Sequence, residues 1–240
     1  MVRHKEVFKV MGAVALGCLV ASSAQAIPIT TNGAWSNPQG TAANVNITND
    51  GVGTDNKISW GVEANALDEQ SSYVFTGLAA VNVDQTAILA GDLFAVGDFT
   101  HNNFTITQGN FTGADLTVNI QVPALGVNID FGPFEFDHNE TPNSPPCDPD
   151  GTPPCPDVVS IPTAFEGIPF TFMGMNWEFF LAGFRESATD PIIPEFITQE
   201  QLANTATLFA GVRKVPEPMT PLLLGLGLLG LGVIRKRKKH

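Results

Sequence analysis

Two histidines in the chain have neighbours that could support metal or acid–base chemistry. They are His101, in Phe-Thr-His-Asn, and His138, in the similar segment Phe-Asp-His-Asn. Imidazole and carboxylate groups together can bind a divalent transition metal. Neither histidine, however, has a second one at the HxH or HxxxH spacing of a local site. We therefore predict no metal ligand and no catalytic residue in either segment.

His101 has a structural interpretation instead. Its neighbours Thr100, Asn102 and Asn103 have side chains that commonly hydrogen-bond the backbone of turns. The segment lies between two stretches that resemble strands. We expect the threonine and the asparagines to cap a turn there, while His101 ties an adjacent loop to the sheet.

Cys147 and Cys155 lie in a segment rich in proline and glycine, residues 143–157, which is a poor helix or strand. Two cysteines so close together favour a disulfide in an oxidising compartment. Closing so short a loop stabilises a fold by about 2–3 kcal/mol in the chain-entropy model. The alternative is a metal site, but two cysteines are too few and no histidine is close enough in sequence.

Other patterns for catalysis or ion binding are incomplete. The chain has one tyrosine, Tyr73, and no Gly-x-Ser-x-Gly segment to hold a nucleophile. Residues 49–55 and 148–151 resemble calcium loops, but neither completes the EF-hand pattern. The twenty-two acidic residues of the body leave a carboxylate pair for glycoside hydrolysis open. We predict a protein that is not an enzyme and needs no cofactor, with calcium at a loop as an open alternative.

The body of the chain, residues 27–214, has the pattern of an all-β domain. Short stretches of β-branched and aromatic residues alternate with turn signals such as Asn49-Asp50-Gly51. One face of a strand is predicted to carry Leu116, Val118, Ile120 and Val122. Only residues 198–204 look helical. The pattern favours a single antiparallel β-sandwich of the jelly-roll-like kind, with seventeen phenylalanines in the chain to fill its core.

The charge of the body excludes one class of partner. The whole chain has a net charge of −12, but residues 27–214 hold twenty-two acidic and four basic side chains, a net charge of −18. No basic patch is left to neutralise phosphates, so we predict no nucleic acid as a partner. An acidic surface suits solubility and cation binding outside a cell.

The first 26 residues resemble a secretory signal peptide. Basic residues precede an apolar stretch, residues 10–20, and Ala24-Gln25-Ala26 follows as a cleavage site. This organisation predicts export by the Sec translocase and cleavage by signal peptidase, with Ile27 as the mature start. The alternative is a lipobox around Cys18, which would make that cysteine a lipidated N-terminus.

The last 26 residues, 215–240, have the order linker, apolar helix and basic tail. Pro216-Glu217-Pro218 precedes a glycine- and leucine-rich run, residues 221–234, and the chain ends in five Lys or Arg residues before His240. A helix of fourteen residues covers about 21 Å, which is less than the roughly 30 Å hydrocarbon core of a bilayer. The basic tail favours a cytoplasmic end. A temporary anchor in the inner membrane is predicted, with a permanent tail anchor as the alternative.

This C-terminal order resembles the PEP-CTERM sorting signal of exported proteins of Gram-negative bacteria. The resemblance implies an exosortase as partner, a membrane-embedded protease that would cut near Pro216, Glu217 and Pro218. The body would then reach the cell surface or the medium. Thr100, His101 and Asn103 also resemble the Thr-His-x-Asn motif of a PEP-CTERM family named for it, the THxN family. Membership of that family implies an architecture and a cellular destination. The family has no assigned biochemical activity.

Three functions follow as expectations from these observations. The first is a structural or adhesive surface protein linked to exopolysaccharide or biofilm, which the sorting signal implies. The second is a carbohydrate-binding module, possibly calcium-dependent, in which Trp35, Trp60 and Trp177 would stack on sugars, although isolated tryptophans are more often core residues. The third is a secreted hydrolase.

Overall fold

A computed structural model describes the body of the chain, residues 26–51, 55–64, 69–141, 147, 155–161 and 167–216. The predicted signal peptide up to Gln25, the sorting residues Glu217 and Pro218, and the apolar run 221–234 lie outside these residues. Most of the loop between the two cysteines also lies outside them.

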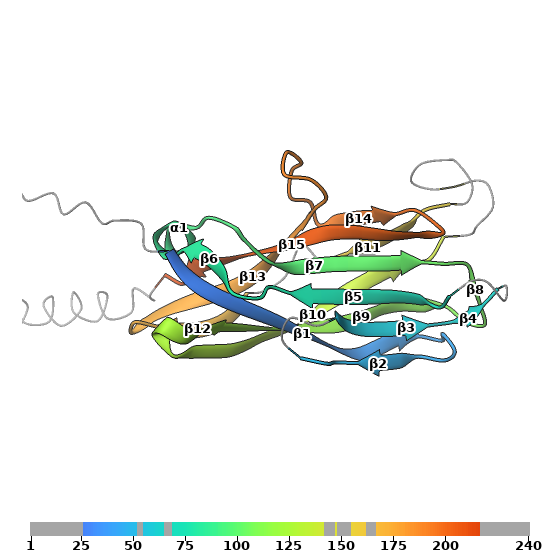
Figure 1. Cartoon of the computed structure of the whole chain (residues 1–240), viewed down its shortest axis with the longest axis horizontal. Coiled ribbons are helices and arrows are strands. Elements are labelled where there is room, and N and C mark those ends of the chain that lie inside the picture. Colours follow the sequence, from blue (N-terminus) through green and yellow to red (C-terminus); the bar gives the residue numbers. More distant parts are fainter. Residues whose placement is uncertain are drawn as a thin grey trace, which may run out of the picture.

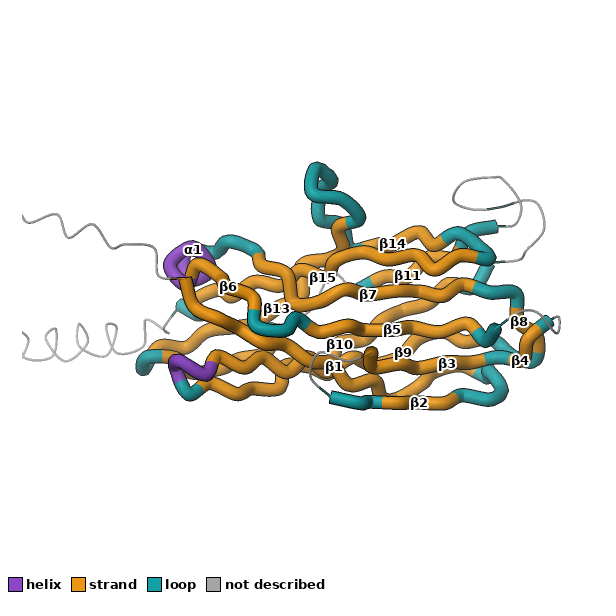
Figure 2. The backbone as a smooth tube through the Cα atoms, in the orientation of Figure 1, coloured by secondary structure: helices purple, strands orange, loops and turns teal. Residues whose placement is uncertain are grey.

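The described body is all-β, as predicted, and its strands form two large antiparallel sheets (Figures 1 and 2). The first sheet has six strands, in the order β14 (Glu195–Thr198), β11 (Asp157–Ser160), β10 (Val127–Asn139), β9 (Phe111–Val122), β1 (Ala26–Gly40) and β6 (Val81–Asp84).

The second sheet has seven strands, in the order β12 (Ile168–Phe172), β13 (Met175–Arg185), β15 (Leu202–Lys214), β7 (Phe94–Asn103), β5 (Ser71–Gly77), β3 (Asp55–Trp60) and β2 (Asn46–Thr48). A small ribbon pairs β4 (Val62–Glu63) with β8 (Ile106–Thr107). The described helices are α1 (Gln85–Ala90) and the 3₁₀ turn η1 (Pro123–Leu125).

Alternation of buried and open positions along the strands builds the core between the sheets. In β9 the predicted face of Leu116, Val118, Ile120 and Val122 is buried, and the residues between them are half-buried. Aromatic rings from the two sheets then meet across the core. Trp35 of β1 lies 5.5 Å from Tyr73 of β5, measured between ring centroids. Burying a side chain of this size contributes about 1.5–3 kcal/mol.

Two local predictions are wrong. Residues 198–204 form no helix, because β14 ends at Thr198 and β15 begins at Leu202. The Asn204 side chain closes the tight turn between them: its Oδ1 accepts from the Gln199 backbone N–H, and its Nδ2 donates to the Gln199 carbonyl, both at 2.8 Å. The Thr-His-x-Asn segment is likewise no turn, since it is the last part of strand β7.

The described chain begins and ends at the same end of the body. Figure 1 shows the start of β1 and the end of β15 together, near α1. Strands β7 and β14, whose last residues are Asn103 and Thr198, end at the opposite end of the body. We call the first of these the terminal end and the second the far end.

A disulfide joins Cys147 to Cys155, as predicted, with a Cα–Cα distance of 5.0 Å. Cys155 is fully buried and lies two residues before Asp157, the first residue of β11. The bridge therefore ties the segment that follows β10 to the start of the next strand of the same sheet.

We predict that the double variant Cys147→Ser/Cys155→Ser loses about 2–3 kcal/mol of unfolding free energy, because the unfolded chain regains the freedom of the closed loop. Urea denaturation of exported protein measures the loss. Non-reducing peptide mapping is the control, and it should find the two cysteines joined in the unaltered protein. Free thiols at these positions would contradict the assignment.

Candidate functional site

The Thr-His-x-Asn segment points alternate side chains to opposite faces of its sheet. Thr100 and Asn102 are half-buried on the outer face of β7, whereas His101 and Asn103 are fully buried between the sheets. This is the period of two that a strand imposes. His101 and Asn103 therefore enter the core, whereas Thr100 and Asn102 do not.

His101 and Asn103 connect β7 to strand β14 of the other sheet. His101 Nδ1 lies 2.8 Å from Thr198 Oγ1, and Asn103 Nδ2 donates to the Thr198 carbonyl at 3.1 Å. Thr198 Oγ1 donates its one hydrogen to the Asp157 carbonyl at 3.3 Å. His101 Nδ1 must therefore be the donor to Thr198. Neutral His101 then carries a lone pair on Nε2.

His138 lies near the end of β10 and faces His101 across the core, with the ring centroids 5.2 Å apart. Its Nδ1 is 2.6 Å from the Tyr73 hydroxyl, which comes from β5 in the second sheet. Its Nε2 is 3.1 Å from Glu140 Oε2 and 3.9 Å from Asp157 Oδ2. Both nitrogens of this buried ring thus face a polar group.

Asp157 completes the group. It is fully buried, and its Oδ1 accepts from the Thr141 backbone N–H at 2.8 Å and from the Thr141 hydroxyl at 3.3 Å. We refer to the following five buried residues, which come from five strands, as the inner polar cluster: Tyr73, His101, His138, Asp157 and Thr198. Glu140 and Glu200 lie at its rim. Their carboxylates and that of Asp157 form a second set of neighbouring groups.

Burial sets the protonation of this cluster. Desolvation, and secondarily the nearby His138, hold the pKa of His101 well below its usual range, so the ring is neutral. Burial and the charge of Glu140 raise the pKa of Asp157 to about 7, against the opposing effects of His138 and the Thr141 hydrogen bonds. Burial also raises the pKa of Tyr73 well above its ordinary value, with Asp157 as the next cause.

An aromatic wall encloses the cluster. The Trp60 ring stacks on Phe111 with 3.8 Å between the centroids, and on His101 with 5.7 Å between them. Trp60 also meets Tyr73 edge to face at 4.8 Å. Such a wall keeps water from the polar atoms and strengthens the electrostatic interactions among them.

The sequence suggested that His101, His138 and nearby carboxylates could share a metal ion, but no local HxH or HxxxH spacing supported such a site, and we predicted none. Their partners come from strands far apart in the chain, so no local spacing could show the cluster. The similarity between the two Phe-x-His-Asn segments was the one available signal. Both phenylalanines are core residues, and the ring centroids of Phe99 and Phe136 lie 5.5 Å apart across the sheets.

Other candidate residues have ordinary structural partners. All three tryptophans considered as sugar platforms are buried, namely Trp35, Trp60 and Trp177. Within the first calcium-like segment, Asn49 Oδ1 accepts from the Trp35 backbone N–H at 2.9 Å, and Asp55 Oδ1 accepts from Thr76 at 2.6 Å. In the described parts of that segment, these oxygens therefore accept hydrogen bonds within the fold.

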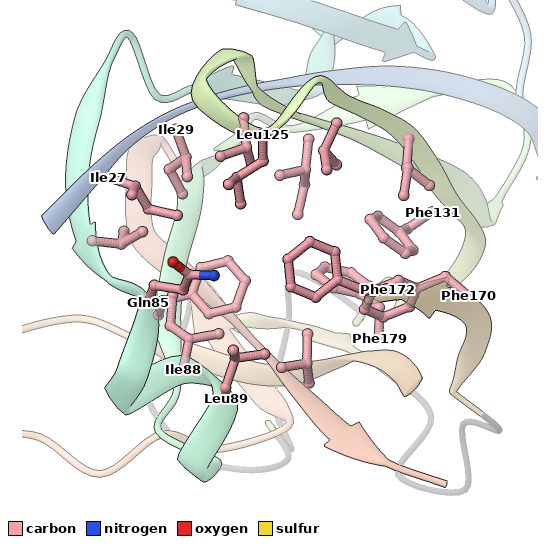
Figure 3. A pocket seen from close by; sticks show the side chains of 17 residues that line it. Ile27, Ile29, Gln85, Ile88, Leu89, Leu125, Phe131, Phe170, Phe172 and Phe179 are labelled. Atoms are coloured by element: carbon pink, nitrogen blue, oxygen red, sulfur yellow. The ribbon is translucent and has the colours of Figure 1, made fainter. Parts of the chain in front are cut away.

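A second feature is an apolar pocket of about 110 Å³ between the sheets at the terminal end (Figure 3). Ile27, Ile88, Leu125 and Phe172 point into it from different elements, and Gln85 is the polar residue at its edge. The two sheets thus enclose an apolar space at the terminal end and a polar cluster at the far end.

The model of one family, the PEP-CTERM protein-sorting motif, matches residues 214–238. The chain therefore carries a PEP-CTERM sorting motif, which marks an exported protein that is a target of an exosortase and is sorted through its C-terminus. No curated protein matches the chain. Among the described residues, no helix has the length and the apolar character to cross a membrane.

We predict that Thr198→Val lowers the unfolding free energy by about 1–3 kcal/mol, because it leaves the buried N–H of His101 without its acceptor. Thr100→Val is the matched control. Its hydroxyl meets Thr205 in an exposed position on the other face of β7, so the change should stay within about 0.5 kcal/mol. Urea denaturation of both variants measures the difference. Equal losses would show that the two faces of the motif do not differ in role.

Proposed function

We propose that this chain is a surface or extracellular-matrix protein with a structural or adhesive role linked to exopolysaccharide. It is exported by the Sec translocase, cut by signal peptidase, held briefly in the inner membrane by its C-terminal helix, and released by an exosortase. The observation that carries the proposal is the sorting motif at residues 214–238.

The place of this motif relative to the fold supports processing after folding. The match begins at Lys214, the last residue of β15. Val215 still donates its N–H to the Asn176 carbonyl at 2.9 Å, and Pro216 is exposed. A cut near Pro216, Glu217 and Pro218 would therefore remove no buried residue of the described body.

The outer face of the six-stranded sheet offers a surface suited to a polysaccharide. A polar hollow of about 450 Å³ lies over β1, β9 and β10. Within it, Asn119 Nδ2 donates to Asn128 Oδ1 at 2.8 Å and to Asp130 Oδ1 at 2.7 Å, while Gln121 Nε2 donates to Asn119 Oδ1 at 3.0 Å. Amide and carboxylate groups in such a row can exchange hydrogen bonds with sugar hydroxyls.

The carbohydrate-binding module with tryptophan platforms is the weaker alternative, because Trp35, Trp60 and Trp177 are core residues. We also propose that the body is not an enzyme. Tyr73 and His101, whose pKa values burial moves well away from their usual range, are fully buried where a polymer does not reach. Membership of the THxN family, carried by Thr100, His101 and Asn103, and a jelly-roll-like arrangement of the sheets are part of the same proposal.

Processing gives the first test. We expect the released protein to begin at Ile27 and to lack residues 235–240, because both signals flank the described body. Intact-mass analysis of protein from the medium and the cell surface measures both ends. Replacing Pro216 and Glu217 by alanine should hold the protein in the membrane fraction. A dominant released species that keeps the basic tail would contradict the proposal.

The polysaccharide gives the second test. We expect the double variant Gln121→Ala/Asn128→Ala to bind exopolysaccharide from the producing cells about fivefold more weakly, the effect of one lost hydrogen bond of about 1 kcal/mol. Asn102→Ala is the matched control, since Asn102 is an amide on the outer face of the other sheet. Affinity electrophoresis compares them. Equal retention of both variants and the unaltered protein would argue against this surface as the binding face.

A further inference from the structure

Two ligating atoms of the inner polar cluster have no hydrogen-bond partner among the described residues. They are His101 Nε2 and Asp157 Oδ2. Both residues are fully buried. An unpaired polar atom in a core costs about 1–3 kcal/mol, and native structures rarely leave one without a reason. The unpaired nitrogen of His101 and the unpaired carboxylate oxygen of Asp157 therefore indicate a partner that binds both.

The unfilled atoms belong to residues that converge. His101, His138 and Asp157 each offer one ligating atom, and these atoms all lie within 4.8 Å of one another. A second set, formed by Glu140, Asp157 and Glu200, meets the same limit and shares Asp157 with the first. Two imidazoles with one carboxylate form a recurrent donor set for zinc and other divalent transition metals.

Each of the three central residues is held by its other polar atom. Thr198 accepts from His101 Nδ1, Tyr73 meets His138 Nδ1, and Thr141 donates twice to Asp157 Oδ1. Metal ligands in proteins are oriented in this way, by hydrogen bonds to the atom that does not ligate. These supports leave His101 Nε2 and Asp157 Oδ2 unpaired, and they leave His138 Nε2 with Glu140 Oε2 at 3.1 Å.

The charge of the cluster also suits a cation. Among the described residues, Asp157 forms an ion pair with His138, at 3.9 Å, and with no Lys or Arg side chain. Glu140 adds a second carboxylate 3.1 Å from His138. A buried carboxylate without a cation is costly, and a divalent ion would offset it.

We propose that His101, His138 and Asp157 bind one divalent transition-metal ion of the zinc class, with Glu140 and Glu200 as carboxylates at the rim. To ligate through Nε2, His138 carries its hydrogen on Nδ1, donates it to the Tyr73 oxygen, and gives up its 3.1 Å contact with Glu140 Oε2 to the ion. His101 comes from the seven-stranded sheet, whereas His138 and Asp157 come from the six-stranded one. The ion is therefore a clamp between the sheets.

The rim provides the way in. The Glu140 side chain is 19 % exposed, whereas the His138 side chain is fully buried. An ion would meet Glu140 first and then pass to the buried imidazoles. This proposal rests on the cluster alone, and it does not depend on how the chain is sorted or on what its outer surface binds.

The test uses the exported protein, stripped with EDTA and titrated with Zn²⁺ by calorimetry, with elemental analysis of the loaded product. We expect one tightly bound zinc per chain and a higher melting temperature after loading. Asp157→Asn keeps the shape of the side chain but removes its charge. It should weaken binding by at least about a hundredfold, the upper end of the loss from a missing second-shell partner.

Two further variants separate ligation from stability. Thr198→Val removes the support of His101 but no proposed ligand, so it should weaken zinc binding by about 10–100-fold. Asp98→Asn is the matched control, an exposed aspartate on the same strand as His101, and it should bind zinc like the unaltered protein. Cobalt loading gives an independent readout, because its visible absorption reports imidazole and carboxylate ligands.

Two outcomes would overturn the proposal. One is an unaltered, folded protein that takes up neither zinc nor cobalt after stripping. The other is an Asp157→Asn variant that binds zinc as tightly as the unaltered and Asp98→Asn proteins, which would place the ion on the acidic surface. A melting temperature that falls on EDTA treatment and returns with zinc, in the unaltered protein but not in Asp157→Asn, would support the clamp.

Discussion

The contact between the two sheets, through a core that changes from apolar to polar along its length, is the constraint on which the rest of the structure depends. Apolar side chains tolerate small shifts, because the free energy of their burial follows area and has no direction. Buried polar atoms do not, since each must meet a partner at hydrogen-bond distance. The bonds from His101 and Asn103 to Thr198 therefore fix how β14 lies over β7.

This division along the core separates the sorting motif and the proposed signal peptide from the polar cluster. The chain enters and leaves the described body at the terminal end, beside the apolar pocket (Figures 1 and 3). The inner polar cluster and Cys155, which lies two residues from Asp157, belong to the far end. A cut at either signal would thus leave every hydrogen bond of the cluster in place. Release from the membrane would then leave the polar cluster unchanged.

Local patterns allowed much of the fold to be predicted, because their physical cause is local. The alternation around Val118 follows from the pleat of one strand, and the Cys147–Cys155 pair closes a short loop. The cluster could not be predicted in this way, since His101 and Thr198 are 97 residues apart and Tyr73 and His138 are 65. The helix predicted at 198–204 failed for a related reason: the side chain of Asn204, which propensity ignores, closes a turn there.

The same sequence separations determine when the proposed metal site can exist. Its three central ligands come from β7, β10 and β11, which lie in different sheets or are joined through the disulfide-bonded segment. Under the proposed Sec export the chain crosses the membrane unfolded and holds no such arrangement, so the ion would bind only after the sheets have met outside the cytoplasm. Its binding free energy would then add to the folding free energy. The exported body would be stabilised in the compartment where its cysteines also pair.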